Sequence, residues 1–292
     1  MKKITLIFCA LILIQFTSMG QGRSTIRFGV GYGFPVASTV TGTNYNYNYQ
    51  AGSYNYENVY DSYGSGLTLN LGYSIRFGKP SAEGKLSLGA DLDVQGLYGK
   101  KISANNRTVD ESFGTFRTTN TVTSNSIEAM LFTPSIVFYI PVKSVEFYYK
   151  VGPTGGISKR YTETISDEVL TGNQQEKNHY ERKLEATGQF TVGVKSSLGI
   201  AIPVGTRWSF FGEVNLTILD FRPDKGKLTV NTRNGVNQIV PPVFDTVYYT
   251  QFNYIYKYIY SDPNSFDAPY RYPIDHASLT NLGFQFGVGF RL

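Results

Sequence analysis

Apolar and polar residues alternate with a period of two along most of the chain. In the first such run, Ile26, Phe28 and Val30 share one face, and Arg27 and Gly29 lie on the other. A period of two is that of a β-strand with one apolar face. Seven further runs follow at about residues 67–77, 86–95, 127–140, 147–152, 190–200, 208–218 and 282–292. The pattern predicts an all-β chain with eight long strands.

The connections between these runs alternate in length. Three are short turns, "KPSAEG", "PVKS" and "PVGT", whereas the others are long polar stretches at about 38–65, 99–125, 159–187 and 222–276. Short turns at one end and long loops at the other are typical of outer-membrane barrels. An even strand count also lets the first and last strands pair, which leaves no sheet edge in lipid.

The sequence therefore predicts an eight-stranded antiparallel transmembrane β-barrel with long extracellular loops. The closing "FGVGF" nearly repeats the early "FGVGY", as expected if the first and last strands are neighbours. The alternative is ten strands, because the segment "LTVNTRNGVNQIV" carries an Asn234-Gly235 hairpin signal. Its flanks are polar on both faces, so we expect that hairpin to stand above the membrane.

The first twenty residues have the layout of a secretory signal peptide. Lys2 and Lys3 precede an apolar run at 4–14, and small residues follow at Ser18 and Gly20. We expect a signal peptide at 1–20 and the barrel at 21–292. Cys9 is the only cysteine, so the mature chain would have none. Loss of the two lysines lowers the net charge from +5 to +3, too little to indicate nucleic acid as a partner.

The C-terminal strand carries a spaced set of residues: Gln285, Gly287, Phe290 and Leu292. On these residues and on its strand pattern, the chain resembles the small outer-membrane β-barrel family of Gram-negative bacteria, which includes the OmpA-type and OmpX-type eight-stranded barrels. The resemblance implies that the four residues are an insertion signal read by the barrel-assembly machinery. It also implies a bacterial outer-membrane location, with lipid and lipopolysaccharide around the barrel. Leu292 departs from the family, which usually ends on an aromatic residue.

The predicted inward faces carry charges of both signs. The set comprises Arg27, Arg76, Lys150, Lys195 and Arg291 with Asp91, Asp93, Glu128 and Glu213. An eight-stranded barrel is just wide enough for side chains to fill, and buried charges are tolerated when they are paired. We therefore expect a salt-bridged, filled lumen. The alternative is a narrow pore or transport barrel.

Catalytic and metal-binding patterns are sparse. His276 and Ser278 form an H-x-S arrangement that resembles the histidine and serine of outer-membrane lipid A deacylases, and a lipid A-modifying enzyme is kept as a second alternative. The chain has no histidine pair at ligand spacing, and the glycines of "GVGYG" follow a strand period rather than a nucleotide-loop spacing. We expect no enzymatic activity, no cofactor and no metal.

Tyrosine is concentrated in the predicted loops. Seven of the 23 tyrosines lie between residues 44 and 63, and eight more lie between 247 and 272. Tyrosine combines a flat apolar face with a polar tip and is enriched in recognition surfaces. One interpretation is a stiff extension of the barrel strands, with tyrosines packed across the sheet. The other, compatible with it, is a surface that binds an extracellular glycan, peptide or protein, which would give the barrel a structural or surface-recognition role.

Overall fold

The structure is a computed structural model, and it describes residues 24–36, 39–48, 51–77, 85–112, 115–171, 176–237, 251–255, 271–273 and 277–292. These residues form an all-β protein with one large sheet and a small two-stranded one, which confirms the predicted class. In the described part of the chain, no helix is long and apolar enough to cross a membrane. The predicted signal peptide at 1–20 lies outside the described residues.

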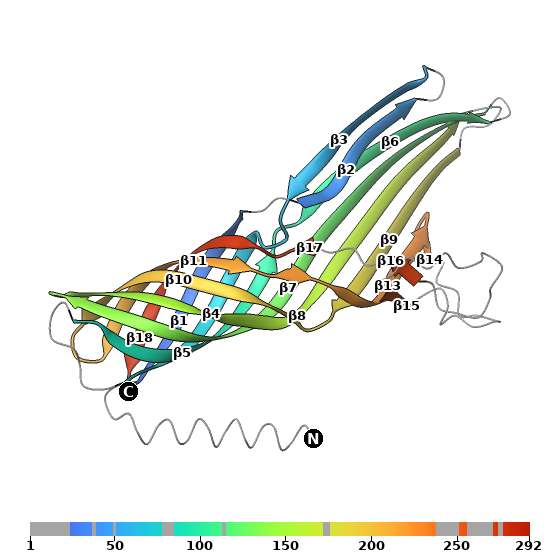
Figure 1. The fold of residues 1–292 in the computed structure, drawn as a ribbon. Helices are drawn as coiled ribbons and strands as arrows, with labels where there is room; N and C mark the ends of the chain where they lie inside the picture. The colour runs from blue at the N-terminus through green and yellow to red at the C-terminus, as the bar shows by residue number, and fades with distance from the viewer. Residues whose placement is uncertain are drawn as a thin grey trace.

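Eight long strands pair in a cycle, and we refer to them as the ring. They are β1 (Ser24–Pro35), β4 (Gly66–Arg76), β5 (Ser87–Gly99), β7 (Thr115–Val142), β8 (Val145–Thr171), β10 (Thr191–Val204), β11 (Trp208–Ile218) and β18 (Asn281–Arg291). Each pairs antiparallel with the next in this order, and β18 pairs with β1. In Figure 1 the ring occupies the lower left of the molecule, and the C-terminus lies at its lower edge.

The two similar sequence ends meet at the pairing of β1 with β18. Phe28 lies opposite Val288, and Gly29 lies opposite Gly287. A Cβ atom on Gly287 would lie 1.9 Å from the carbonyl oxygen of Phe28, so no larger residue fits without a shift of the backbone. The alternating glycines therefore permit close approach of the two strands at this seam.

Eight further strands extend the large sheet beyond the ring. They are β2 (Thr39–Asn48), β3 (Ser53–Asp61), β6 (Ile102–Ser112), β9 (Glu176–Gly188), β13 (Pro223–Arg233), β14 (Val236–Asn237), β15 (Gln251–Ile255) and β16 (Arg271–Pro273). The small separate sheet consists of β12 (Asp220–Phe221) and β17 (Ala277–Ser278). β7 and β8 have 28 and 27 residues, so both continue from the ring into this extension. There they pair with β6 and β9, and the β2–β3 hairpin joins the edge of β6 in parallel.

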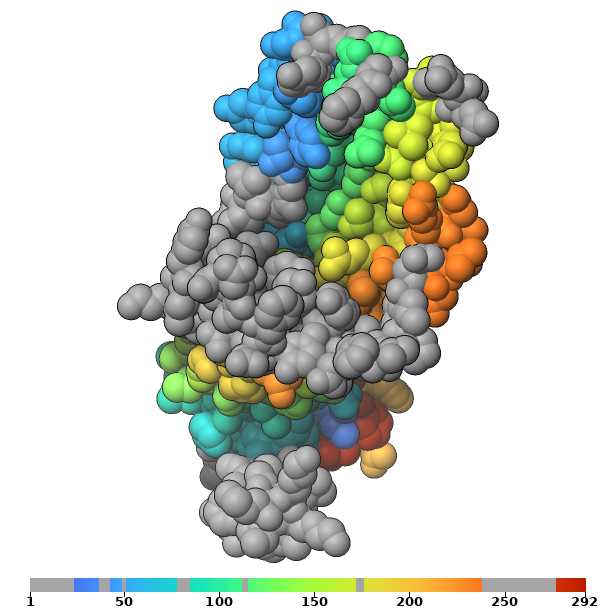
Figure 2. All heavy atoms as spheres, turned by 90° about the vertical axis from the view of Figure 1, so that its right-hand side faces the viewer, coloured from blue at the N-terminus to red at the C-terminus, as the bar shows by residue number. Residues whose placement is uncertain are grey.

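We call this extension the wall. Figure 2 shows its strands side by side, from the blue β2–β3 hairpin through green β6 and β7 and yellow β8 and β9 to orange β13. Three of the four polar stretches predicted as loops are thus mostly strand. Asn234 and Gly235, both with positive φ, form the turn between β13 and β14, which pair in the wall and outside the ring. The hairpin signal was real, but it adds no strands to the ring.

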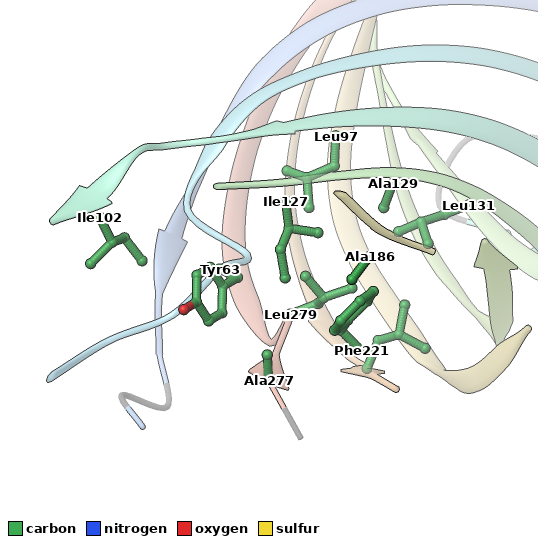
Figure 3. Packing of buried hydrophobic residues seen from close by; sticks show 11 residues of the cluster. Tyr63, Leu97, Ile102, Ile127, Ala129, Leu131, Ala186, Phe221, Ala277 and Leu279 are labelled. Carbon is green, nitrogen blue, oxygen red and sulfur yellow. The ribbon is translucent and has the colours of Figure 1, made fainter. Parts of the chain in front are cut away.

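Burial in the ring is the reverse of that in a water-soluble sheet protein. Outward side chains are large and apolar, and Phe28 on β1 is 55% exposed. The buried inward positions are mostly polar, and they include Lys150, Gln95 and Asn215. Among the described residues, the largest buried apolar cluster lies where the ring meets the wall, with members from β5, β6, β7, β9, β12 and β17 (Figure 3).

Candidate functional site

The centre of the ring holds a network of ion pairs. Lys150 on β8 is 2% exposed, and its Nζ lies 2.8 Å from Asp93, 2.8 Å from Glu213 and 3.3 Å from Asp91. Arg27 on β1 contacts the same three carboxylates, at 3.1 Å from Asp93 and 3.7 Å from Glu213. The network therefore ties four ring strands together across the interior.

A second polar layer lies next to this network. Lys195 on β10 donates a hydrogen bond to the amide oxygen of Gln95 on β5, across the interior, at 2.7 Å. Asn70 on β4 donates to Gln285 on β18 at 3.3 Å. Lys195, Lys150 and Arg27 balance three carboxylates, so the charges of these buried layers cancel. Such a cross-linked interior is suited to bracing the ring.

Six of the nine residues predicted to form the lumen charge cluster lie in these layers: Arg27, Asp91, Asp93, Lys150, Lys195 and Glu213. The other three lie elsewhere. Arg76 pairs with Glu146 at the end of the ring that carries the short turns, a partner that the sequence pattern did not indicate. Arg291 is exposed at the same end.

Glu128 is on the opposite face from the one predicted. It is exposed and accepts a hydrogen bond from Tyr161, whereas its neighbour Ile127 is fully buried. The register of β7 stays in phase on both sides of Pro134, so the strand has no bulge that would turn Glu128 inward. The interior of the ring next to Glu128 is apolar. The assignment of charged residues to the inward face therefore fails at this position.

That apolar part of the interior forms a cap over the polar layers. β12 and β17 pair with each other, and Phe221 on β12 is 0% exposed. Backbone hydrogen bonds hold the segments together, from Leu279 to Leu219 at 2.8 Å and from Tyr63 to Ser278 at 3.1 Å. Figure 3 shows Phe221, Leu279 and Tyr63 converging with side chains of β5 and β7. The cap separates the charged layers from the wall side.

The cap is the main feature that sequence reasoning missed. Its segments "LDF" at 219–221 and "ASL" at 277–279 are only three residues each and flank the last long polar stretch. The apolar residues at both ends of that stretch were the available signal. Ser278, one of the two residues of the H-x-S arrangement, is buried in the cap and accepts a hydrogen bond from the backbone N–H of Thr280. His276 lies outside the described residues.

The proposed insertion-signal residues all lie on or just after β18, with two orientations. Gln285 is buried and faces the interior, whereas Phe290 faces outward and packs against Trp208 with ring centroids 4.9 Å apart. Gly287 lies at the seam, and Leu292 is half exposed beyond the strand end. Within the part of the chain that the structure describes, no group of three or more histidine, cysteine or acidic residues is placed to hold a metal ion.

The wall presents tyrosines on one face. Tyr45 lies opposite Tyr56, and Tyr47 lies opposite Tyr54 with ring centroids 6.2 Å apart. Tyr54 and Tyr56 are well exposed. Cross-strand tyrosine packing is what the interpretation as a stiff extension required.

The other face of the wall carries an ordered polar row. Asn55, Asn46, Arg107 and Asn120 are successive neighbours in register on β3, β2, β6 and β7, and all four are exposed. They line an open groove of about 500 Å³. The wall thus has planar amide and guanidinium groups on one side and aromatic rings on the other.

Comparisons with protein-family models and with curated proteins give no match for this chain. Functional inference therefore depends on the geometry described above.

Proposed function

We propose that the ring is an eight-stranded transmembrane β-barrel of a bacterial outer membrane and that the wall is an extracellular recognition surface. The observation that carries the first part is the inverted burial of the ring. A sheet with large apolar side chains outside and charged side chains inside is stable in lipid, because each side chain then meets a compatible medium. The ring strands that do not continue into the wall have 11 to 14 residues, enough to cross a hydrocarbon layer at a tilt.

The orientation follows from the connections. In outer-membrane barrels, short turns face the periplasm and long segments face outside. The turn between β7 and β8 consists of Lys143 and Ser144, whereas the opposite end carries the wall. The resemblance to the OmpA-type and OmpX-type family favours the same arrangement.

Recognition is the role that the wall supports best. Its sheet is continuous with β7 and β8, so its tyrosine face and polar row are held on a rigid support. A preorganised surface loses little conformational entropy on binding. Exposed tyrosines on one face and planar amide groups on the other suit a glycan, a peptide or a protein as the ligand.

The lumen supports a closed barrel rather than a pore. The ion-pair network fills the interior at one height, and the apolar cap closes it at another. An ion would have to disrupt both layers to pass. We therefore expect no single-channel conductance from the purified protein in planar bilayers.

Site-specific labelling in intact cells tests the proposal. The mature chain lacks cysteine if the leader is removed, so single-cysteine variants Tyr54→Cys in the wall and Ser144→Cys in the short turn can be treated with a membrane-impermeant maleimide. Tyr54→Cys should react in intact cells, and Ser144→Cys should react only after the outer membrane is opened. Reaction of Ser144→Cys in intact cells, or recovery of the protein without detergent, would refute the membrane assignment.

Recognition is tested separately. A glycan array and a pull-down from intact cells should each be run with the wild type and with a Tyr54→Ala/Tyr56→Ala variant. If the variant no longer binds the ligands that the wild type retains, and Ser144→Cys is labelled as before in the variant chain, the wall is supported as the binding surface. If the variant retains every ligand, the recognition role of this face is wrong, although the barrel could still be correct.

A further inference from the structure

The end of the ring opposite the wall contains a cavity of about 270 Å³, which lies below the ion-pair network and shares only Arg27 with it. Its floor is aromatic and buried, formed by Tyr148 and Phe211 with the Arg27 guanidinium between them at 5.8 and 5.7 Å from the ring centroids. The hydroxyl of Tyr148 donates to Glu213 at 3.1 Å, which fixes its ring. The cavity is therefore preformed and has an apolar base.

Arginines surround the mouth of this cavity. Arg76 lies on one side of the cavity, with its guanidinium 4.3 Å from the ring centroid of Tyr139, and pairs with Glu146. Arg207 and Arg291 lie on the other side of the cavity. They are next to each other, since the backbone N–H of Arg291 donates to the carbonyl of Arg207. Among the lining residues, three mouth arginines thus face one carboxylate.

Arg207 is the last residue before β11 and lies next to Arg291 at the end of β18, and like charges side by side at a sheet end repel each other. No carboxylate of the described residues, including that of the C-terminal Leu292, lies within ion-pair distance of either guanidinium. Guanidinium groups bind carboxylate and phosphate oxygens with two parallel hydrogen bonds. An anion between the two side chains would turn their repulsion into a binding contribution.

We propose that this cavity binds a small organic anion, with its carboxylate or phosphate group between Arg207 and Arg291 and its apolar body on the Tyr148 and Phe211 rings. The volume lies just below the usual range for ligand pockets, so it suits a ligand of about one ring plus one charged group. In the proposed orientation the mouth opens to the periplasm. The chemistry of the site is independent of that orientation and of the wall.

Calorimetric titration of the full-length protein in detergent tests the site. The probes are phenyl phosphate, inorganic phosphate and the cation benzamidine. Phenyl phosphate should bind, inorganic phosphate should bind more weakly because it has no apolar body, and benzamidine should not bind. If phenyl phosphate gives no more heat than benzamidine, the site is wrong. If inorganic phosphate binds as tightly as phenyl phosphate, the role of the aromatic floor is wrong.

Two variants separate this site from a general charge effect. Arg207→Gln and Arg291→Gln should each weaken phenyl phosphate binding about tenfold or more, as expected for loss of a charged hydrogen bond. Lys85→Gln removes a positive charge just before β5, at the same end of the ring and outside the cavity, and should leave binding unchanged. Equal weakening in all three variants would show nonspecific attraction and overturn the proposal.

Stability measured without ligand provides a second readout. Because the substitution relieves like-charge repulsion, Arg291→Gln should unfold at the same or a higher urea concentration than the wild type. At the same concentration, phenyl phosphate should raise the midpoint of the wild type more than that of the variant. A variant less stable than the wild type in the absence of ligand would show that the two arginines stabilise the fold themselves, which would also refute the proposal.

Discussion

Replacement of Lys150 by methionine should destabilise the ring strongly. The ammonium group lies within 3.3 Å of three buried carboxylates, on Asp91, Asp93 and Glu213. Methionine fills similar space but leaves three negative charges opposed by only Arg27 and Lys195. Removing one partner of a buried ion pair costs about 3 to 5 kcal/mol, because an uncompensated charge stays buried.

The free energy of unfolding can be measured by urea titration of the protein refolded in lipid vesicles. Trp208 is the only tryptophan and lies on the outward face of β11, so its fluorescence should report the loss of the ring. The control is Lys159→Met, which removes an ammonium group that pairs with Glu185 at 2.8 Å but is half exposed. An exposed pair contributes little, so the control should unfold near the wild-type midpoint.

The double variant Lys150→Met/Glu213→Gln makes the test quantitative. It restores the balance of charge, so its loss should be smaller than the sum of the two single losses by about 2 to 3 kcal/mol. If Lys150→Met changes the free energy of unfolding by less than about 0.5 kcal/mol, or if the two losses simply add, the network is not a coupled unit.

Three further expectations follow from other parts of the molecule. Leu198→Arg, at the middle of β10, should lower the free energy of unfolding in lipid by about 2 to 4 kcal/mol, and Val192→Arg, near one end of β10, by about 0 to 1, because the penalty depends on depth in the bilayer. Equal losses in the same urea assay would contradict the membrane placement. Phe221→Ala should lower the free energy of unfolding by about 3 to 5 kcal/mol, because the Phe221 side chain is fully buried in the cap. A variant as stable as the wild type would show that the cap is loosely packed. Hydrogen bonds from Lys101 and Lys183 lower the pKa of Glu163 in the wall. The stabilisation from these bonds is therefore present above the ordinary pKa of about 4.5 and is lost as the pH falls through the lowered pKa. An NMR titration of the Glu163 carboxyl that shows no downward shift of its pKa would refute this expectation.

Strand positions were accessible from the sequence because period-two alternation depends on neighbours along the chain. The β1–β18 seam was predictable for the same reason, through the two glycine repeats. Lys150 could be placed inside from its parity, but its three partners come from β5 and β11, and no local pattern names them.

The misplaced Glu128 shows the limit of this reasoning. Parity gives two faces, and the choice between them relied on the rule that charge points inward. That rule holds only where the interior is polar. The interior near Glu128 is apolar because β12 and β17 fold back from distant positions to form the cap. Such a contact depends on tertiary folding and leaves only short apolar signals in the sequence.

The seam also constrains how the chain can fold. It joins Thr25 to Arg291, so closing it requires two segments about 266 residues apart to meet. The entropic cost of such a loop is about 5 kcal/mol if the intervening chain is disordered, and it falls when that chain has already assembled. The seven other ring pairings join segments that are nearer in sequence. Closure of the seam should therefore be the last and slowest step, and until it occurs both β1 and β18 are open edges that can pair with other chains.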